Sequence, residues 1–191
     1  MTDLIITGVG GQGIVLTSKL IAAASMEKGY DVMSAETIGM AQKGGSVVSC
    51  LRIGHDIKAP MFPKGSADIL IGFEPAETVR MLPYLKKGGT VILNTHPIMP
   101  VTAALTGGSY SGSDMVHYLE SLDIRLVSLD ADKLCREAGS PKVLNMIMLG
   151  AAVNSGVLPF TLDDAETVMR KTVKPQFAEM NAKALRCAVT A

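Results

Sequence analysis

The sequence contains no tryptophan, 4% aromatic residues and only 3 cysteines among 191 residues. The cysteines stand apart, at Cys50, Cys135 and Cys187, without a Cys-x-x-Cys pair or a Cys/His cluster. A structural zinc or a four-cysteine iron–sulfur cluster needs several thiolate or imidazole ligands in one place, so this spacing excludes both. We therefore expect a chain that binds no metal and carries no electrons itself.

An excess of charge of either sign is also missing, because 18 Lys and Arg residues balance 18 Asp and Glu residues. Binding to nucleic acid or to an anionic membrane through basic residues requires an excess of them, so we expect neither partner. The N-terminus has no basic, apolar leader, and no apolar run is long enough to span a membrane. Scattered cysteines in an odd number are typical of a reducing compartment, which predicts a cytoplasmic protein.

Charged residues make up 19% of the chain, below the usual quarter, while 48% are hydrophobic and 12 are methionine. A monomer with a large core and a subunit that covers part of its surface with a partner both give this composition. The segment Lys142 to Leu158 presents the same choice, since it is apolar on nearly every side. We expect a buried helix there, either as plain core or with one face forming an intersubunit seam.

Short apolar runs alternate with segments of helical periodicity, which is typical of a doubly wound, mostly parallel α/β sheet. The expected strands are 3–7, 31–36, 46–53, 68–72, 90–94 and 124–128, and the expected helices are 14–28, 74–85, 114–121 and 132–138. The first strand, helix and strand together resemble a Rossmann unit. Residues 142–191 form a helical C-terminal part, with a helix N-cap at 161–164 and a last helix from Pro175 to about Val189. We expect the 191 residues to form one domain.

The motif Gly8-x-Gly10-x-x-Gly13 lies between the first strand and the first helix. Glycines there allow a tight turn and let a phosphate approach the free N–H groups of the helix. Glu36, at the end of the second strand, has nearly the spacing of an acid that binds a ribose. A self-sufficient NAD(P)-binding protein is therefore one hypothesis. The alternative is a glycine turn that only lets helix and strand pack closely.

A second polar loop, Ala35 to Ser46, follows the second strand and contains Gln42, Lys43, Gly44 and Gly45. Open α/β sheets bind ligands at the carboxyl ends of their strands. A lysine beside exposed glycine amides can receive a carboxylate or a phosphate. A solvated lysine in a surface turn has the same sequence, so the spacing alone leaves both interpretations open.

The histidines and cysteines add little to the candidate site. His55, His96 and His117 have no metal-ligand spacing, and we expect surface or capping roles, although His96 follows a strand end where a site could lie. Cys50 and Cys187 are expected in the core. Basic neighbours could lower the pKa of Cys135 and make it reactive, and burial is the alternative.

Two segments together, Ile6 to Leu16 and Ala35 to Ser49, resemble the gamma-type domain of the 2-oxoacid:ferredoxin oxidoreductases. Within that family they are most similar to the branch that oxidises indolepyruvate. Segments 68–75, 91–95 and 145–150 resemble the same family, so the similarity extends over most of the chain.

The resemblance implies a non-cluster subunit of a thiamine-diphosphate enzyme that oxidatively decarboxylates an aryl-2-oxoacid to the acyl-CoA. Thiamine diphosphate, Mg²⁺ and the iron–sulfur clusters are then expected on a large (alpha) partner subunit, with electrons passing to ferredoxin and coenzyme A as co-substrate. We expect this chain to be inactive alone and to form a homodimer when isolated. The resemblance implies no catalytic residue in this chain. It implies instead that the chain forms one wall of a shared site for substrate, coenzyme A or another anion. The residues of this wall are Gly10, Gly11, Gln12, Gly13, Glu36, Gln42, Lys43, Gly44 and Gly45.

Overall fold

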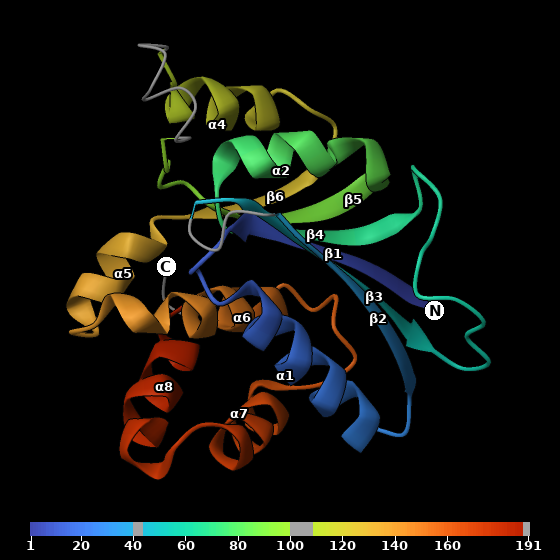
Figure 1. Cartoon of the computed structure of the whole chain (residues 1–191), viewed down its shortest axis with the longest axis vertical. Helices are drawn as coiled ribbons and strands as arrows, with labels where there is room; N and C mark the ends of the chain where they lie inside the picture. Colours follow the sequence, from blue (N-terminus) through green and yellow to red (C-terminus); the bar gives the residue numbers. More distant parts are fainter. Residues whose placement is uncertain (40–43, 100–108, 189–191) are drawn as a thin grey trace.

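A computed structural model describes residues 1–39, 44–99 and 109–188, and its centre is a twisted sheet (Figure 1). Within these residues the sheet has six strands in the order β2-β3-β1-β4-β5-β6. Their bounds are β1 (Thr2–Val9), β2 (Asp31–Ile38), β3 (Ser46–Gly54), β4 (Ala67–Gly72), β5 (Leu85–Asn94) and β6 (Arg125–Leu129). Each expected strand is therefore present, and strand β5 begins earlier than expected.

Strands β1, β4, β5 and β6 run parallel to one another, which confirms the mostly parallel sheet. Strand β3 runs antiparallel to both β1 and β2 and lies between them. The expected first unit therefore exists as β1, helix α1 (Ile14–Glu27) and β2, but its two strands are not neighbours as they are in a Rossmann unit. Residue polarity explains this order. Val47, Leu51 and Ile53 of β3 are buried, whereas β2 is rich in polar residues and suits a sheet edge.

Helices cover both faces of the sheet, as the doubly wound prediction requires (Figure 1). One face carries α1 (Ile14–Glu27), α6 (Leu144–Asn154), α7 (Leu162–Thr172) and α8 (Pro175–Cys187). The other face carries α2 (Pro75–Met81) and α4 (Gly112–Glu120), while α5 (Ala131–Glu137) lies beside α6 at the end of the sheet. No helix among the described residues is long and apolar enough to cross a membrane.

Helix α6 is the Met-rich helix of the C-terminal part, and it is buried within this chain. Met146, Ile147, Met148 and Leu149 have no exposed surface, and α6 packs against α1, α5, α7, α8 and β5. This confirms the core interpretation. The intersubunit seam does not hold for α6, because residues Asn145 to Val153 are all buried within this chain.

The helix expected over 74–85 is shorter than its periodicity indicates. It ends at Met81, a 3₁₀ turn covers Leu82–Tyr84, and β5 starts at Leu85. Pro83 explains the end, because a proline cannot donate the hydrogen bond that continues an α-helix. Lys86 to Gly89 therefore belong to a strand, where the pairing with β4 shifts register.

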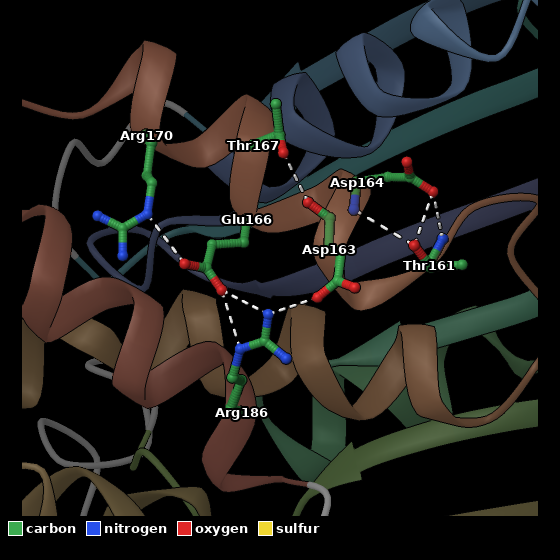
Figure 2. A network of polar contacts seen from close by, with 7 residues as sticks. All are labelled: Thr161, Asp163, Asp164, Glu166, Thr167, Arg170 and Arg186. Carbon is green, nitrogen blue, oxygen red and sulfur yellow. Dashed lines mark hydrogen bonds and ion pairs between the residues drawn. The ribbon is translucent and has the colours of Figure 1, made fainter.

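A network of charged side chains joins α7 to α8 (Figure 2). Arg186 of α8 lies 2.6 Å from Asp163 and donates from Nε to Glu166 at 2.8 Å. Arg170 donates to the other Glu166 oxygen at 2.9 Å, so this carboxylate bridges both guanidinium groups. These contacts hold the pKa of Glu166 below its ordinary value, chiefly through the hydrogen bond from Arg186.

Thr161 and Asp164 form the expected N-terminal cap of α7 as a capping box (Figure 2). The hydrogen bond from Lys28 lowers the pKa of Asp164 most, and the hydrogen bond from the Thr161 backbone N–H comes next; together they bring it from 3.8 to about 2.

A carboxylate such as Asp164, whose pKa is lower in the folded state, stabilises the fold above its unfolded pKa. It loses that effect as the pH falls through the folded value. We expect Asp164→Asn to lower the melting temperature at neutral pH. The difference from wild type should shrink between pH 3.8 and about 2, and thermal unfolding across that range measures it. A constant difference would contradict this assignment.

Candidate functional site

The candidate site lies where the chain leaves two neighbouring parallel strands in opposite directions. Strand β1 continues into α1 on one face of the sheet, and β4 continues into α2 on the other (Figure 1). The carboxyl ends of β1 and β4 therefore form a topological switch point. Ligands of open α/β sheets bind in the crevice at such points.

The first glycine motif turns the chain at this switch point. Gly13 is the N-cap of α1, with φ 86°, no side-chain cap and no acidic residue in the first turn of the helix. Helix α2 differs, because its N-cap Glu74 accepts a hydrogen bond from the Glu77 backbone N–H at 2.9 Å. Of the two helices that begin here, α1 therefore keeps its positive N-terminal end available to an anion.

Gln12 holds the turn closed. Its Oε1 accepts a hydrogen bond from the Val9 backbone N–H at 2.7 Å, and its Nε2 donates to the Phe73 carbonyl at 2.9 Å. A Cβ placed on Gly8 would lie 2.6 Å from that Oε1, so Gly8 is needed to make room for this side chain. Gln12 thus links β1 to the end of β4, and its amide is occupied by the protein itself.

The second glycine motif lies against the first in the structure. The Gly10 backbone N–H donates to the Gly45 carbonyl at 2.8 Å, and Gly44 beside it is exposed. The predictions for Gln42 and Lys43 fall outside the described residues. The two motifs, far apart in sequence, therefore form one wall at the switch point.

Glu36 is not brought to this wall. It is exposed on the edge strand β2 and pairs with Ser49 of β3, and it does not line the cleft beside the glycine turn. An acid that binds the ribose of a dinucleotide projects from the strand next to β1, but in this fold that neighbour is β3. Because two strand spacings amount to roughly 10 Å, the geometry does not join Glu36 to Gly8, Gly10 and Gly13.

An open cleft of about 560 Å³ lies beside the glycine turn and has this turn as one wall. Its other residues come from α1, from the chain after β5, and from the segments around α5 and α6. The lining comprises Gly10, Gly11, Gln12, Gly13, Leu16, His96, Ile98, Asp132, Pro141, Lys142, Leu144 and Asn145.

Sequence reasoning missed the polar residues of the far wall. The side chain of His96 is exposed, as expected, and it also borders the cleft, with Nδ1 3.9 Å from Asp132 Oδ2. Buried Asn94 supports this pair. Its side chain donates to Asp132 Oδ2 at 3.3 Å and accepts from the backbone N–H of His96 at 3.3 Å. The strand end before His96 was the one available signal, and Asp132, Lys142 and Asn145 had none strong enough.

The structure gives no support to a reactive cysteine. Cys135 is buried in α5, and burial, followed by the nearby Asp132 charge, raises its pKa to about 11 despite the opposing effect of Arg136. Cys50 is also buried, and burial raises its pKa too. Both thiols therefore stay protonated near neutral pH. Among the described residues, no group of three His, Cys, Asp or Glu side chains could hold a metal ion.

Comparison with known sequences gives matches along nearly the whole chain. The family model for pyruvate ferredoxin/flavodoxin oxidoreductase matches residues 3–191. Indolepyruvate oxidoreductase subunit IorB of Archaeoglobus fulgidus is 38% identical over 185 residues, covering 96% of this chain and 92% of that protein. The common gamma subunit of the pyruvate/ketoisovalerate oxidoreductases of Pyrococcus abyssi is 26% identical over 191 residues, covering 97% and 94%.

Solved structures share the fold at lower sequence identity. The gamma subunit of the keto/oxoacid ferredoxin oxidoreductase of Geobacter sulfurreducens superposes with a TM-score of 0.72 at 21% identity, covering 100% of both chains. The 2-oxoglutarate:ferredoxin oxidoreductase of Magnetococcus marinus, solved with 2-oxoglutarate, coenzyme A and succinyl-CoA bound, superposes with a TM-score of 0.74 at 17% identity. This chain corresponds to 30% of that longer one.

Proposed function

Since this chain belongs to the pyruvate ferredoxin/flavodoxin oxidoreductase family, we propose that it is the small subunit of an indolepyruvate-type ferredoxin oxidoreductase. In this role it takes part in the oxidative decarboxylation of an aryl-2-oxoacid to the acyl-CoA, with electrons passing to ferredoxin. The names of its relatives support the substrate class, because those with the higher identities are indolepyruvate oxidoreductase subunits.

The redox and thiamine chemistry belongs, in this proposal, to a large partner subunit. Thiamine diphosphate, Mg²⁺ and iron–sulfur clusters are cofactors of that partner. The described residues of this chain offer no cluster of metal ligands, and its cysteines lie on β3, α5 and α8. The residues of this chain do not fit these cofactors, so no step on a cofactor is assigned to this chain.

The contribution of this chain is one wall of a shared site. We assign to Gly10, Gly11 and Gly13, with Gly44 and Gly45, the contact with the phosphate groups of coenzyme A. The observation that carries this assignment is the hydrogen bond from Gly10 to Gly45, which joins both glycine motifs beside the uncapped N-terminus of α1. Gln12 acts through the turn it closes, and Glu36 drops out of the wall because it lies on the edge strand.

Reconstitution with the large subunit tests the proposed function. The complex should reduce a viologen dye only when a 2-oxoacid and coenzyme A are both present, and indolepyruvate should give a higher kcat/KM than pyruvate or 2-oxoglutarate. Each chain alone should be inactive. Full activity from the large subunit alone would contradict the proposal, and preference for pyruvate would contradict the substrate class.

The NAD(P)-binding hypothesis makes a separate prediction, because it needs no partner. Strand β3 separates Glu36 from the glycine turn, and the Gln12 side chain fills the space above Gly8, so we expect NADH to leave the melting temperature of the isolated chain unchanged. A rise at millimolar NADH would favour that hypothesis instead. We also propose a cytoplasmic location, in agreement with Cys50 and Cys135, which form no disulfide. We also propose that the isolated chain forms a homodimer, and its molar mass in light scattering tests this.

A further inference from the structure

Asn145 is a largely buried residue whose side-chain amide faces the cleft. It lies in the first turn of α6, its residue is 5% exposed, and its side chain lines the cleft next to the glycine turn. It packs so closely on Gly13 that a Cβ added there would lie 2.8 Å from the Asn145 Cβ. Within the described part of the chain, no hydrogen bond is formed by the Asn145 side chain.

Other buried asparagines behave differently. Asn94 donates to the Phe73 carbonyl at 3.1 Å and accepts from the Ala131 N–H at 3.2 Å. Asn181 of α8 donates to the Phe177 carbonyl at 2.7 Å. The Asn145 amide is not among the fully buried polar atoms that lack a partner, so it meets the cleft and not the core. The next residues of α6 are apolar, so packing alone does not require an amide at position 145.

The surroundings of Asn145 identify the kind of ligand that would satisfy it. The N-terminus of α1 faces the same cleft without a side-chain cap, and Lys142 adds a positive charge that has no acidic partner among the described residues. The opposing carboxylate, Asp132, is hydrogen-bonded to Asn94. The cleft therefore combines an anion-binding end with a neutral group that both donates and accepts hydrogen bonds.

We propose that Asn145 hydrogen-bonds to an amide of the pantetheine arm of coenzyme A, while the α1 N-terminus and Lys142 hold the adjoining pyrophosphate. A carboxamide pairs well with another amide because each supplies one N–H and one carbonyl. In coenzyme A, amides lie along the chain that begins at the pyrophosphate, so one ligand reaches both parts of the cleft. This inference rests on the proposed function, and it adds Asn145 as the residue that recognises the neutral arm.

The test uses the reconstituted complex with Asn145→Leu and Asn145→Asp, and Asn181→Leu as the matched buried-amide control. Asn145→Leu should raise the KM for coenzyme A roughly 3- to 10-fold, the effect of one neutral hydrogen bond, with the KM for the 2-oxoacid unchanged. Asn145→Asp should raise it roughly tenfold or more, because it adds a negative charge beside the pyrophosphate.

Stability separates this role from a structural one. Asn145→Leu removes no hydrogen bond within the chain, so the melting temperature should stay equal or rise. Asn181→Leu breaks its bond to Phe177 and should lower the melting temperature while leaving the KM for coenzyme A unchanged. A fall in stability with Asn145→Leu and no change in that KM would overturn the proposal.

Inhibition by fragments of coenzyme A locates the contact. Asn145→Leu should weaken inhibition by desulfo-coenzyme A and by phosphopantetheine, and should leave inhibition by adenosine 3′,5′-bisphosphate unchanged. The reverse pattern would assign Asn145 to the adenine and overturn the pantetheine contact.

The experiments distinguish a wrong assignment of Asn145 from a wrong proposed function. If only the role of Asn145 is wrong, the complex is active and Lys142→Gln still raises the KM for coenzyme A. If the proposed function is wrong, the complex shows no coenzyme A-dependent activity.

Discussion

Adding one methyl group at Gly150 is expected to lower the melting temperature of the chain by about 10 °C. Gly150 lies in the middle of α6, where this helix crosses α8. A Cβ at this position would overlap the Leu185 carbonyl oxygen and lie 3.0 Å from the Leu185 carbonyl carbon. Backbone atoms cannot rotate away as a flexible side chain can, so α8 would have to move as a whole. Overpacking of this kind costs about 3 kcal/mol, and in a chain of this size each kcal/mol lowers the melting temperature by roughly 2–4 °C.

Gly156→Ala is the matched control for Gly150→Ala. Gly156 follows the same helix with φ 75°, and a Cβ there meets no atom within 4 Å. This variant should cost only the left-handed backbone strain of about 1–2 kcal/mol. Thermal unfolding of both variants measures the difference. Equal losses would mean that the close approach of α6 and α8 does not limit the residue at position 150.

The same crossing shows which parts of the fold the sequence predicts well. An apolar helix over 142–158 and its burial follow from the local pattern of apolar residues, and so does the alternation of strands and helices. The order β2-β3-β1 was not predicted, although the polar residues of β2 suit a sheet edge and the buried residues of β3 suit the place beside β1. The early end of α2 at Met81 was readable from Pro83, but the apolar periodicity through Leu85 outweighed this signal.

The candidate site was predictable on one side only. The family resemblance carried by the glycine motifs at 8–13 and 44–45 assigned both motifs to one wall, and in the structure a hydrogen bond from Gly10 to Gly45 joins them. The family resemblance, which those motifs carried, is confirmed by the match over residues 3–191. His96, Asp132, Lys142 and Asn145 come from separate segments, and only the sheet order and the packing of α6 on α1 bring them together. Glu36 had the right spacing, but the insertion of β3 removes it from the wall.

Gly13→Ala is expected to reduce kcat/KM for coenzyme A in the reconstituted complex by roughly 10- to 100-fold, the scale of a 1 Å misplacement in a site. The added Cβ would lie 2.8 Å from the Asn145 Cβ and 3.0 Å from its Cγ. Either the glycine turn or the first turn of α6 must then shift, and each forms a wall of the cleft. The backbone adds a second cost, because φ at Gly13 is 86° and an L-residue adopts that value only under strain.

Gly29→Ala separates these two costs, because Gly29 follows the other end of α1 with φ 83° and open space around its Cβ position. Both variants should lose the stability that left-handed strain costs, about 1–2 kcal/mol, and Gly13→Ala should lose more because of its contact with Asn145. Only Gly13→Ala should impair use of coenzyme A, since Gly29 lies away from the cleft. Steady-state kinetics of both complexes at a temperature well below either melting transition measure this. If the two variants showed equal kcat/KM, the glycine turn would be a structural element of the fold, and the phosphate contact assigned to it would have to lie on the partner subunit.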